Sequence, residues 1–472
     1  MRAQIMKWGK GGAEAENSSG MTFSSISLFF LLSLGAVPVT SSVGEAMRLY
    51  SLGRQAEARN MLETIARAQP ANFEAHFRLG LLALDAQDLP AAEASLNRAS
   101  QLQPADAKVW LALAQTYRKL KDRKSAAEAA ARAEQLASND PMLLHGLALF
   151  HSEAGSWAKA AVLESRYAKM APDDRDALVR ASSFYLQAGQ PRPAIDLAGR
   201  ALAKEKRADL HNLLGKAYEA DGQFDKSIVE LQKAIQLAPR EESYVFDLAY
   251  VLLLHQNFDV AIQLLESAKK VFDRSAQLEL ALGIANYGQR KFPEAVDSFL
   301  RTAELAPKVE QPYVFLARII SHAEGRLGEV TAKFARFAKE NPRNYLGHFL
   351  HAKGLIAQIG PSGSDDLSSQ ADGLLRRSIE LKPNFWESHF ELGVLLEGRK
   401  QFEPSATHLR RAIQLNPNAS TPHYRLARVY DRLGKSELAQ KERDLHDKLT
   451  AEERAAIEKH AAGLKRLELV VK

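Results

Sequence analysis

The sequence predicts an all-α protein, a solenoid of about twelve stacked helical hairpins followed by one terminal helix. Prolines recur at intervals of 34 residues, and small residues recur at two fixed places within each interval. Alanine, the strongest helix former, is abundant throughout these intervals. With 46% hydrophobic and 25% charged residues, the chain has an ordinary soluble composition rather than that of a disordered or polytopic membrane protein.

The prolines fix the repeat length. Pro70 and Pro104 are 34 residues apart, as are Pro383 and Pro417. In most units a proline at position 32 ends the second helix, because proline cannot extend the helical hydrogen-bond ladder. The units at 107, 175 and 242 lack this proline. In this numbering the units start at residues 39, 73, 107, 141, 175, 208, 242, 276, 311, 345, 386 and 420, and the unit at 345 is seven residues longer than the others.

Small residues at positions 8 and 20 predict where the two helices of a unit cross. Eleven of the twelve residues at position 8 are small, and position 20 is almost always alanine or serine. A larger side chain at either position would force the helices apart. The unit at 311 has Arg318 and Val330 instead, so we expect irregular packing there.

Two further positions complete the predicted hairpin. Leucines at positions 7 and 24 fill the space between the paired helices. Position 15 is glycine at residues 53, 155, 189, 222, 325 and 434. Glycine just past a helix adopts the left-handed conformation that closes it, so the first helix of each unit ends there.

This pattern resembles the tetratricopeptide repeat family. The closest unit contains Trp110, Leu113, Ala114 and Tyr117, followed by Ala126. The resemblance covers roughly residues 39–450. It implies a right-handed superhelix in which the first helix of each unit lines the concave side, and it implies binding of protein or peptide partners.

The two ends of the chain follow different patterns. Residues 1–20 are expected to be disordered or a misassigned start. Residues 26–39 form an uncharged apolar run, too short for a transmembrane helix of about 20 residues, and Thr40, Ser41 and Ser42 follow it. We therefore expect residues 21–41 to be a signal peptide of a bacterial exported protein, periplasmic or secreted, with an uncleaved membrane anchor as the alternative.

The solenoid is expected to span residues 42–450, with a capping helix at 451–472. Thr450 and Glu453 have the spacing of a capping box at a helix start. Ile457, Ala461 and Leu464 then form an apolar stripe, which would cover the open face of the last unit.

A stripe of apolar and aromatic residues predicts a partner-binding groove. The family resemblance places positions 2, 5, 9 and 12 on the concave side, and nine of eleven residues at position 5 are apolar or aromatic. Rigid aromatic side chains suit the anchoring of a peptide. The alternative is that they pack against the next repeat. The candidate binding residues are Phe246, Tyr250, Tyr287, Phe315, Phe349, Phe390 and Tyr424.

A second candidate surface is basic. Arg425, Arg428 and Arg432 share one helix face, in a segment where ten basic residues accompany four acidic ones. An acidic protein segment or an anionic membrane would fit this patch. The alternative is a solvated face that keeps the end of the stack soluble.

No catalytic, metal or cofactor site is predicted. The chain has no cysteine, and no carboxylate pattern completes a metal site around His348 and His351. Lys435 follows a glycine but lacks the earlier glycine of a phosphate loop. Nucleic acid is not an expected partner.

We therefore expect a non-enzymatic scaffold that binds protein or peptide partners, peripheral to the membrane or within an envelope complex. The alternatives are an accessory subunit of a secretion, polysaccharide-export or enzyme complex and, third, an enzyme with an unrecognised site.

Overall fold

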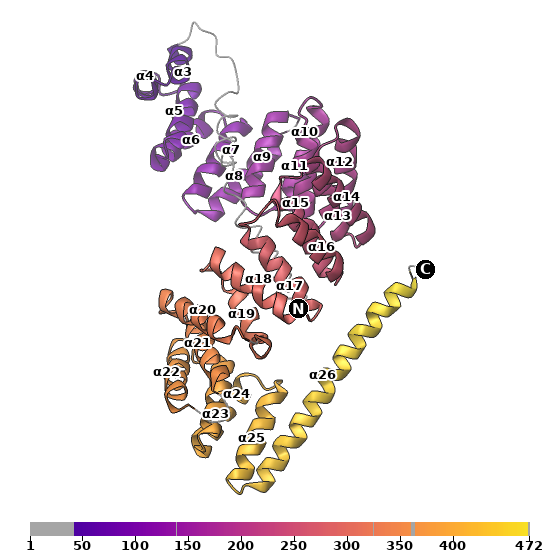
Figure 1. Ribbon diagram of the computed structural model, residues 1–472. Helices are drawn as coiled ribbons and strands as arrows, with labels where there is room; N and C mark the ends of the chain where they lie inside the picture. Colours follow the sequence, from indigo (N-terminus) through magenta and orange to yellow (C-terminus); the bar gives the residue numbers. More distant parts are fainter. Residues whose placement is uncertain (1–41, 138, 324, 360–363, 471–472) are drawn as a thin grey trace. The chain divides into compact units, whose positions relative to one another are not determined.

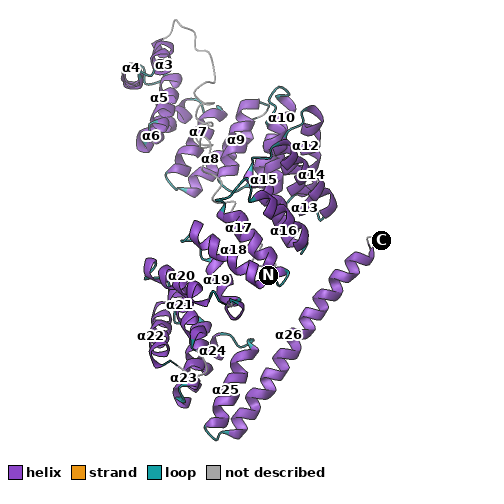
Figure 2. Ribbon diagram, viewed as in Figure 1, coloured by secondary structure: helices purple, strands orange, loops and turns teal. Residues whose placement is uncertain are grey.

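The computed structural model describes residues 42–137, 139–323, 325–359 and 364–470, with side chains up to residue 455. Every regular element within these ranges is a helix (Figure 2). The helices alternate as the first and second helices of consecutive repeats, so the predicted all-α architecture of stacked hairpins is confirmed (Figure 1). The signal-like segment and residues 1–20 lie outside the described residues.

The helices belong to two compact parts, one ending at Leu254 and the other beginning at His255. The first part contains α3 (Ser42–Ser51), α4 (Gln55–Ala68), α5 (Phe73–Asp85), α6 (Leu89–Leu102), α7 (Ala107–Lys119), α8 (Arg123–Leu136), α9 (Pro141–Glu153), α10 (Trp157–Met170), α11 (Ala177–Gln187), α12 (Pro191–Lys204), α13 (Ala208–Ala220), α14 (Phe224–Leu237) and α15 (Glu242–Leu254). The second part contains α16 (Phe258–Ala268), α17 (Ala276–Gly288), α18 (Phe292–Leu305), α19 (Gln311–Arg318), the 3-10 helix η2 (Ile320–His322), α20 (Leu327–Glu340), α21 (Tyr345–Gln358), α22 (Asp365–Leu381), α23 (Trp386–Gly398), α24 (Phe402–Leu415), α25 (Ser420–Arg432) and α26 (Ser436–Val470).

The hairpins follow the repeat numbering closely. Ten of the twelve first helices begin at the predicted unit start, from α5 at Phe73 to α25 at Ser420. The exceptions, α3 and α11, begin a few residues later. The repeat numbering taken from the prolines and the small residues therefore predicted most helix starts.

The two helices of a hairpin cross at the predicted small residues. A methyl group added to Gly80 would lie 2.5 Å from Cγ of Leu96, and one added to Gly215 would lie 2.6 Å from Cγ of Leu231. In both hairpins the position-8 glycine therefore lies against the position-24 leucine. In the second part Gly393 lies against Leu409 in the same way, and Gly283 lies against Phe299. The residues at position 20 are buried as well.

The turn between the helices uses a left-handed residue at position 15. The six predicted glycines have φ between +69° and +77°. Five other hairpins place a non-glycine residue in the same conformation: Gln87, Lys121, Gln256, Arg290 and Lys400. The geometry of the turn is thus a property of the repeat, and glycine is the residue that adopts it without strain.

Consecutive hairpins are joined by a hydrogen bond that the sequence alone did not indicate. The Trp110 indole donates to the carbonyl of Pro104 at 2.9 Å, and His348 and His389 donate from Nε2 to the carbonyls of Pro342 and Pro383. In each case the ring is at position 4 and the carbonyl belongs to the position-32 proline of the preceding unit. The proline therefore ends one helix and anchors the next.

The hairpin at residue 311 is irregular, as its sequence predicted. Helix α19 ends at Arg318, the residue at the small position, and η2 follows it. The Arg318 side chain is exposed, with its guanidinium carbon 6.0 Å from the Phe315 ring centroid. An arginine cannot occupy the close crossing, so the first helix of this unit stops early.

The predicted capping helix is wrong in its start. Helix α26 runs without a break through Thr450, whose hydroxyl has no hydrogen-bond partner in the part of the chain that the structure describes. No proline interrupts residues 436–470, and good helix formers surround Thr450, so the capping-box spacing does not start a new helix. Helix α26 pairs with α25 through His423, which bonds Glu442 at 2.6 Å, and then extends beyond it (Figure 1).

We expect Gly215→Ala to lower the free energy of unfolding by about 1–3 kcal/mol, because the new methyl group collides with Leu231. In a Leu231→Ala background the further loss is expected to be smaller, since the colliding atoms are gone. Urea denaturation followed by circular dichroism measures both effects.

Gly199→Ala is the matched control. Gly199 lies in helix α12 with no heavy atom within 4 Å of the added methyl group, so alanine is expected to stabilise the chain by about 0.5–1 kcal/mol. If Gly215→Ala were tolerated as well as Gly199→Ala, the close crossing would not constrain the fold.

Candidate protein-binding surface

Three of the seven predicted groove residues are packing residues. Phe246, Phe315 and Phe349 are 6%, 5% and 8% exposed. The Phe315 ring stacks on Phe299 with centroids 4.9 Å apart, and Phe349 packs edge-on against Phe385 at 5.1 Å. Their role is to fill the space between neighbouring helices, which corrects the expectation that they line an open groove.

The other four residues present part of their rings at the surface of the first helices. Tyr250, Tyr287 and Phe390 are half-buried, and Tyr424 is 45% exposed. Burial raises the pKa of Tyr250, and the negative charge of Glu219 raises it further, so its hydroxyl is neutral at physiological pH. In residues of this kind packing holds the aromatic ring in place, while part of the side chain remains accessible to a partner.

A cluster next to Phe349 was missed by the sequence reasoning. The Lys382 ammonium lies 4.1 Å from the Tyr345 ring centroid and donates to its hydroxyl at 3.0 Å. The centroid of the Phe385 ring lies 5.6 Å from the same ammonium, and the Phe385 ring packs edge-on against Tyr345 at 4.9 Å. Lys382 sits immediately before the position-32 proline, where spacing gives no hint of an aromatic contact.

Glu387 adds a carboxyl group near this cluster. Burial raises its pKa, while Lys382 and Arg318 oppose the rise. Its Oε2 is buried and has no hydrogen-bond partner in the described part of the chain. The cluster therefore contains aromatic rings, the Lys382 ammonium bonded to one of them, and the Glu387 carboxyl group, one oxygen of which accepts no hydrogen bond from the described residues.

The predicted basic patch on α25 is partly neutralised. Arg425 and Arg428 both form ion pairs with Glu397, at 3.3 and 3.2 Å. Arg428 also lies over the Tyr424 ring at 5.9 Å. Arg432 is exposed at the end of the helix. The structure thus brings two of the three arginines together around one carboxylate of the preceding hairpin.

Two histidines approach each other in one hairpin of the second part. His389 and His408 approach at 3.2 Å between their Nδ1 atoms, and Nε2 of His389 donates to Pro383. Burial, with Arg411 nearby, lowers the pKa of His389. Burial lowers the pKa of His408, and the charges of His389 and Arg376 lower it further. The negative charge of Asp372 acts in the opposite direction. In two other hairpins the same positions hold a histidine and a glutamate, at His211–Glu230 and His423–Glu442.

We expect stability to fall as the pH drops below about 6.5, because the unfolded histidines then bind protons that the folded pair resists. His408→Glu converts the pair to the histidine–glutamate type, so its urea midpoint should fall less between pH 7.5 and 5.5 than that of the wild type. An equal fall in both proteins would show that the pair contributes nothing to the acid sensitivity.

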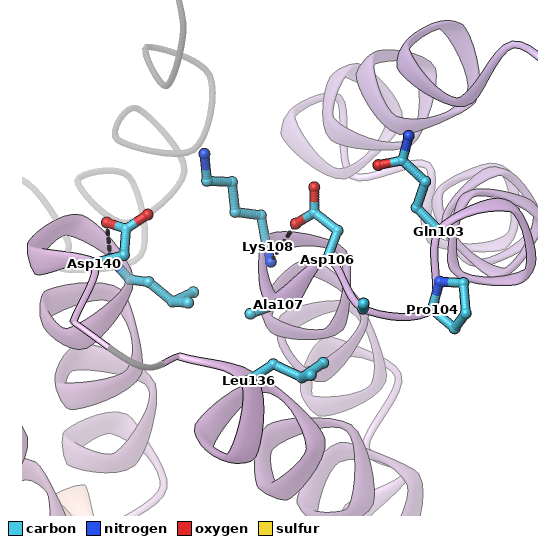
Figure 3. A pocket seen from close by; sticks show the side chains of 9 residues that line it. Gln103, Pro104, Asp106, Ala107, Lys108, Leu136 and Asp140 are labelled. Carbon is cyan, nitrogen blue, oxygen red and sulfur yellow. Dashed lines mark hydrogen bonds between the residues drawn. The ribbon is translucent and has the colours of Figure 1, made fainter.

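No helix in the described part of the chain combines the length and hydropathy needed to cross a membrane. A cavity of about 570 Å³ lies at helix ends lined by Pro104, Asp106, Leu136 and Asp140 (Figure 3). The carboxylates of Asp106 and Asp140 accept hydrogen bonds from backbone N–H groups at the starts of α7 and α9, so their role here is helix capping.

Family models and solved structures indicate which known proteins this chain resembles. A tetratricopeptide repeat model matches residues 43–107, 82–141 and 246–310, and a second matches residues 208–241. No curated protein matches the sequence. Among solved structures, the MamA protein is 21% identical over 36% of this chain and 92% of its own, with a TM-score of 0.32. Yeast Tom70 is 16% identical over 90% and 95%, with a TM-score of 0.35. YrrB, described as a TPR protein with an unusual peptide-binding site, is 18% identical over 40% and 97%, with a TM-score of 0.31.

These matches fall on hairpins whose helix starts, crossing residues and turn geometry follow one 34-residue repeat. The family models and the repeat geometry together support a tetratricopeptide repeat protein.

Proposed function

We propose that this protein is a non-catalytic scaffold that binds protein or peptide partners through the first helices of its hairpins. The observation that carries the proposal is the partial exposure of aromatic rings there, above all Tyr424 at 45%. Tetratricopeptide repeats form interaction scaffolds, which supports the general class of function. The specific surface is our proposal.

The physical argument rests on the difference between two sets of aromatic residues. Phe315 and Phe349 are buried by packing against neighbouring residues, so a partner cannot use their rings as anchors. Phe390 and Tyr424 occupy the same repeat position in the last two hairpins, yet their rings keep exposed area. A half-buried ring needs little ordering on binding, because its rotamer is already held by Trp386 or His446. Such rings suit contact with a peptide segment.

Site-specific photo-crosslinking in cells tests this surface. A photoreactive amino acid replaces Phe390 or Tyr424, and the control replaces Val260, which lies on a second helix with a similar exposure of 41%. We expect protein adducts at residues 390 and 424 and few or none at 260. Adducts at 260 alone, or equal yields at all three residues, would contradict the proposal.

Export is a further part of the proposal and rests on the apolar run at residues 26–39 alone. A scaffold with a cleaved signal would meet its partners in the cell envelope or outside the cell. Fractionation with sequencing of the mature N-terminus is expected to find the chain outside the cytoplasm, beginning close to Ser42. A cytoplasmic chain that still begins at Met1 would refute export and leave the binding surface untouched.

A further inference from the structure

The second helices carry a series of basic residues that the proposed function does not use. In five consecutive hairpins of the first part, position 26 is Arg98, Arg132, Arg166, Arg200 or Lys233. All five side chains are exposed. Because the position recurs once per repeat, these cations occupy equivalent points on α6, α8, α10, α12 and α14.

The charge is most concentrated on α8, α10 and α12. These three helices contain nine lysines and arginines against four acidic residues. All nine basic residues are exposed. Besides the position-26 row, each helix has a cation in its first two turns: Lys124, Lys159 and Arg192. We call the exposed side chains of these three helices the basic second-helix face.

The acidic residues of these helices offset little of that charge. Glu164 is fully buried, where His145 and Arg180 bond its two oxygens, so it is absent from the surface. Glu134 bonds His151 at 2.6 Å and Lys159 at 3.3 Å. Only Glu128 and Asp196 are exposed, and their nearest cations are 4.0 and 3.8 Å away. Such long, exposed pairs are weak and easily exchanged.

Apolar side chains lie among the cations. On α10, Val162 is 51% exposed and Met170 is 40% exposed. Val162 lies between Lys159 and Arg166 with the i, i+3, i+7 spacing of one helix face. The Lys159–Glu134 ion pair links α10 to α8, so the apolar patch and the neighbouring cations belong to one continuous surface.

We propose that the basic second-helix face binds an acidic protein segment whose aspartates or glutamates flank apolar side chains. Guanidinium groups form paired hydrogen bonds to carboxylates, and Val162 and Met170 offer contact to the apolar residues between them. This surface is separate from the aromatic residues of the first helices, so either proposal can fail without the other.

Two other anionic partners fit the surface less well. A membrane-binding helix inserts large apolar side chains such as Trp, Phe or Leu, and here only Val162 and Met170 protrude. Single-stranded nucleic acid stacks on exposed aromatic rings, whereas the aromatic Trp157 of α10 is half-buried beside Phe184. Glu128 and Asp196 would also repel phosphate groups.

The test uses the full chain and a fluorescent peptide in which glutamates flank leucines. We expect binding that weakens as salt rises from about 0.05 M to about 0.3 M, and an affinity loss of about tenfold or more in the triple variant Arg132→Glu, Arg166→Glu, Arg200→Glu. The control variant is Arg301→Glu, Arg336→Glu, Arg377→Glu, at the same repeat position in the second part, and is expected to bind like the wild type. Circular dichroism verifies that both variants remain helical.

Three results would overturn the proposal. The peptide fails to bind the wild type, or it binds both triple variants and the wild type alike. In separate arms, phosphatidylserine vesicles or a single-stranded DNA oligonucleotide bind the same face as tightly as the peptide does, which would indicate a membrane or a general polyanion site instead.

Discussion

The contact between a glycine or alanine at position 8 and a large apolar side chain at position 24 is the interaction on which the rest of this structure depends. It sets how closely the two helices of a hairpin approach, as Gly215 and Leu231 show. The approach in turn fixes the face that each hairpin offers to the next one. Stacking then positions the ring at position 4 beneath the carbonyl of the preceding proline, as in Trp110 and Pro104. The crossing within a hairpin therefore also determines the contact between that hairpin and the next one.

The same constraint divides the surface into layers with different chemistry. First helices are held close to their neighbours, so some of their aromatic residues, such as Phe315 and Phe349, are packing residues, while others keep exposed area. Second helices lie on the other side of the crossing, where long charged side chains such as Arg132 and Arg200 are free to extend. Binding by this protein is therefore expected to rest on two kinds of surface, one aromatic and one basic. Each follows from a repeat position rather than from a single specialised loop.

The sequence was sufficient to predict the hairpin starts, the crossing residues, the left-handed turns and the defect at Arg318, because each depends on residues within one repeat. It was insufficient for Phe315 and Phe349, because their exposure depends on Phe299 in α18 and on Phe385, the residue before α23. It also misplaced the terminal helix: a capping-box spacing at Thr450 cannot start a helix where the surrounding residues favour continuing one. The Lys382 cluster has no sequence signal, since it requires three side chains to converge after folding.

Amide hydrogen exchange measures the central claim most directly, because it reports local opening of each helix. If small crossing residues hold the hairpins closed, the end of the first helix should be least protected where Arg318 replaces them. We predict that amides of residues 319–323 exchange faster than those of residues 284–288 in α17 and 353–357 in α21. Equal protection in the three segments would contradict the account, because the crossing residue would then have no influence on the helix that carries it.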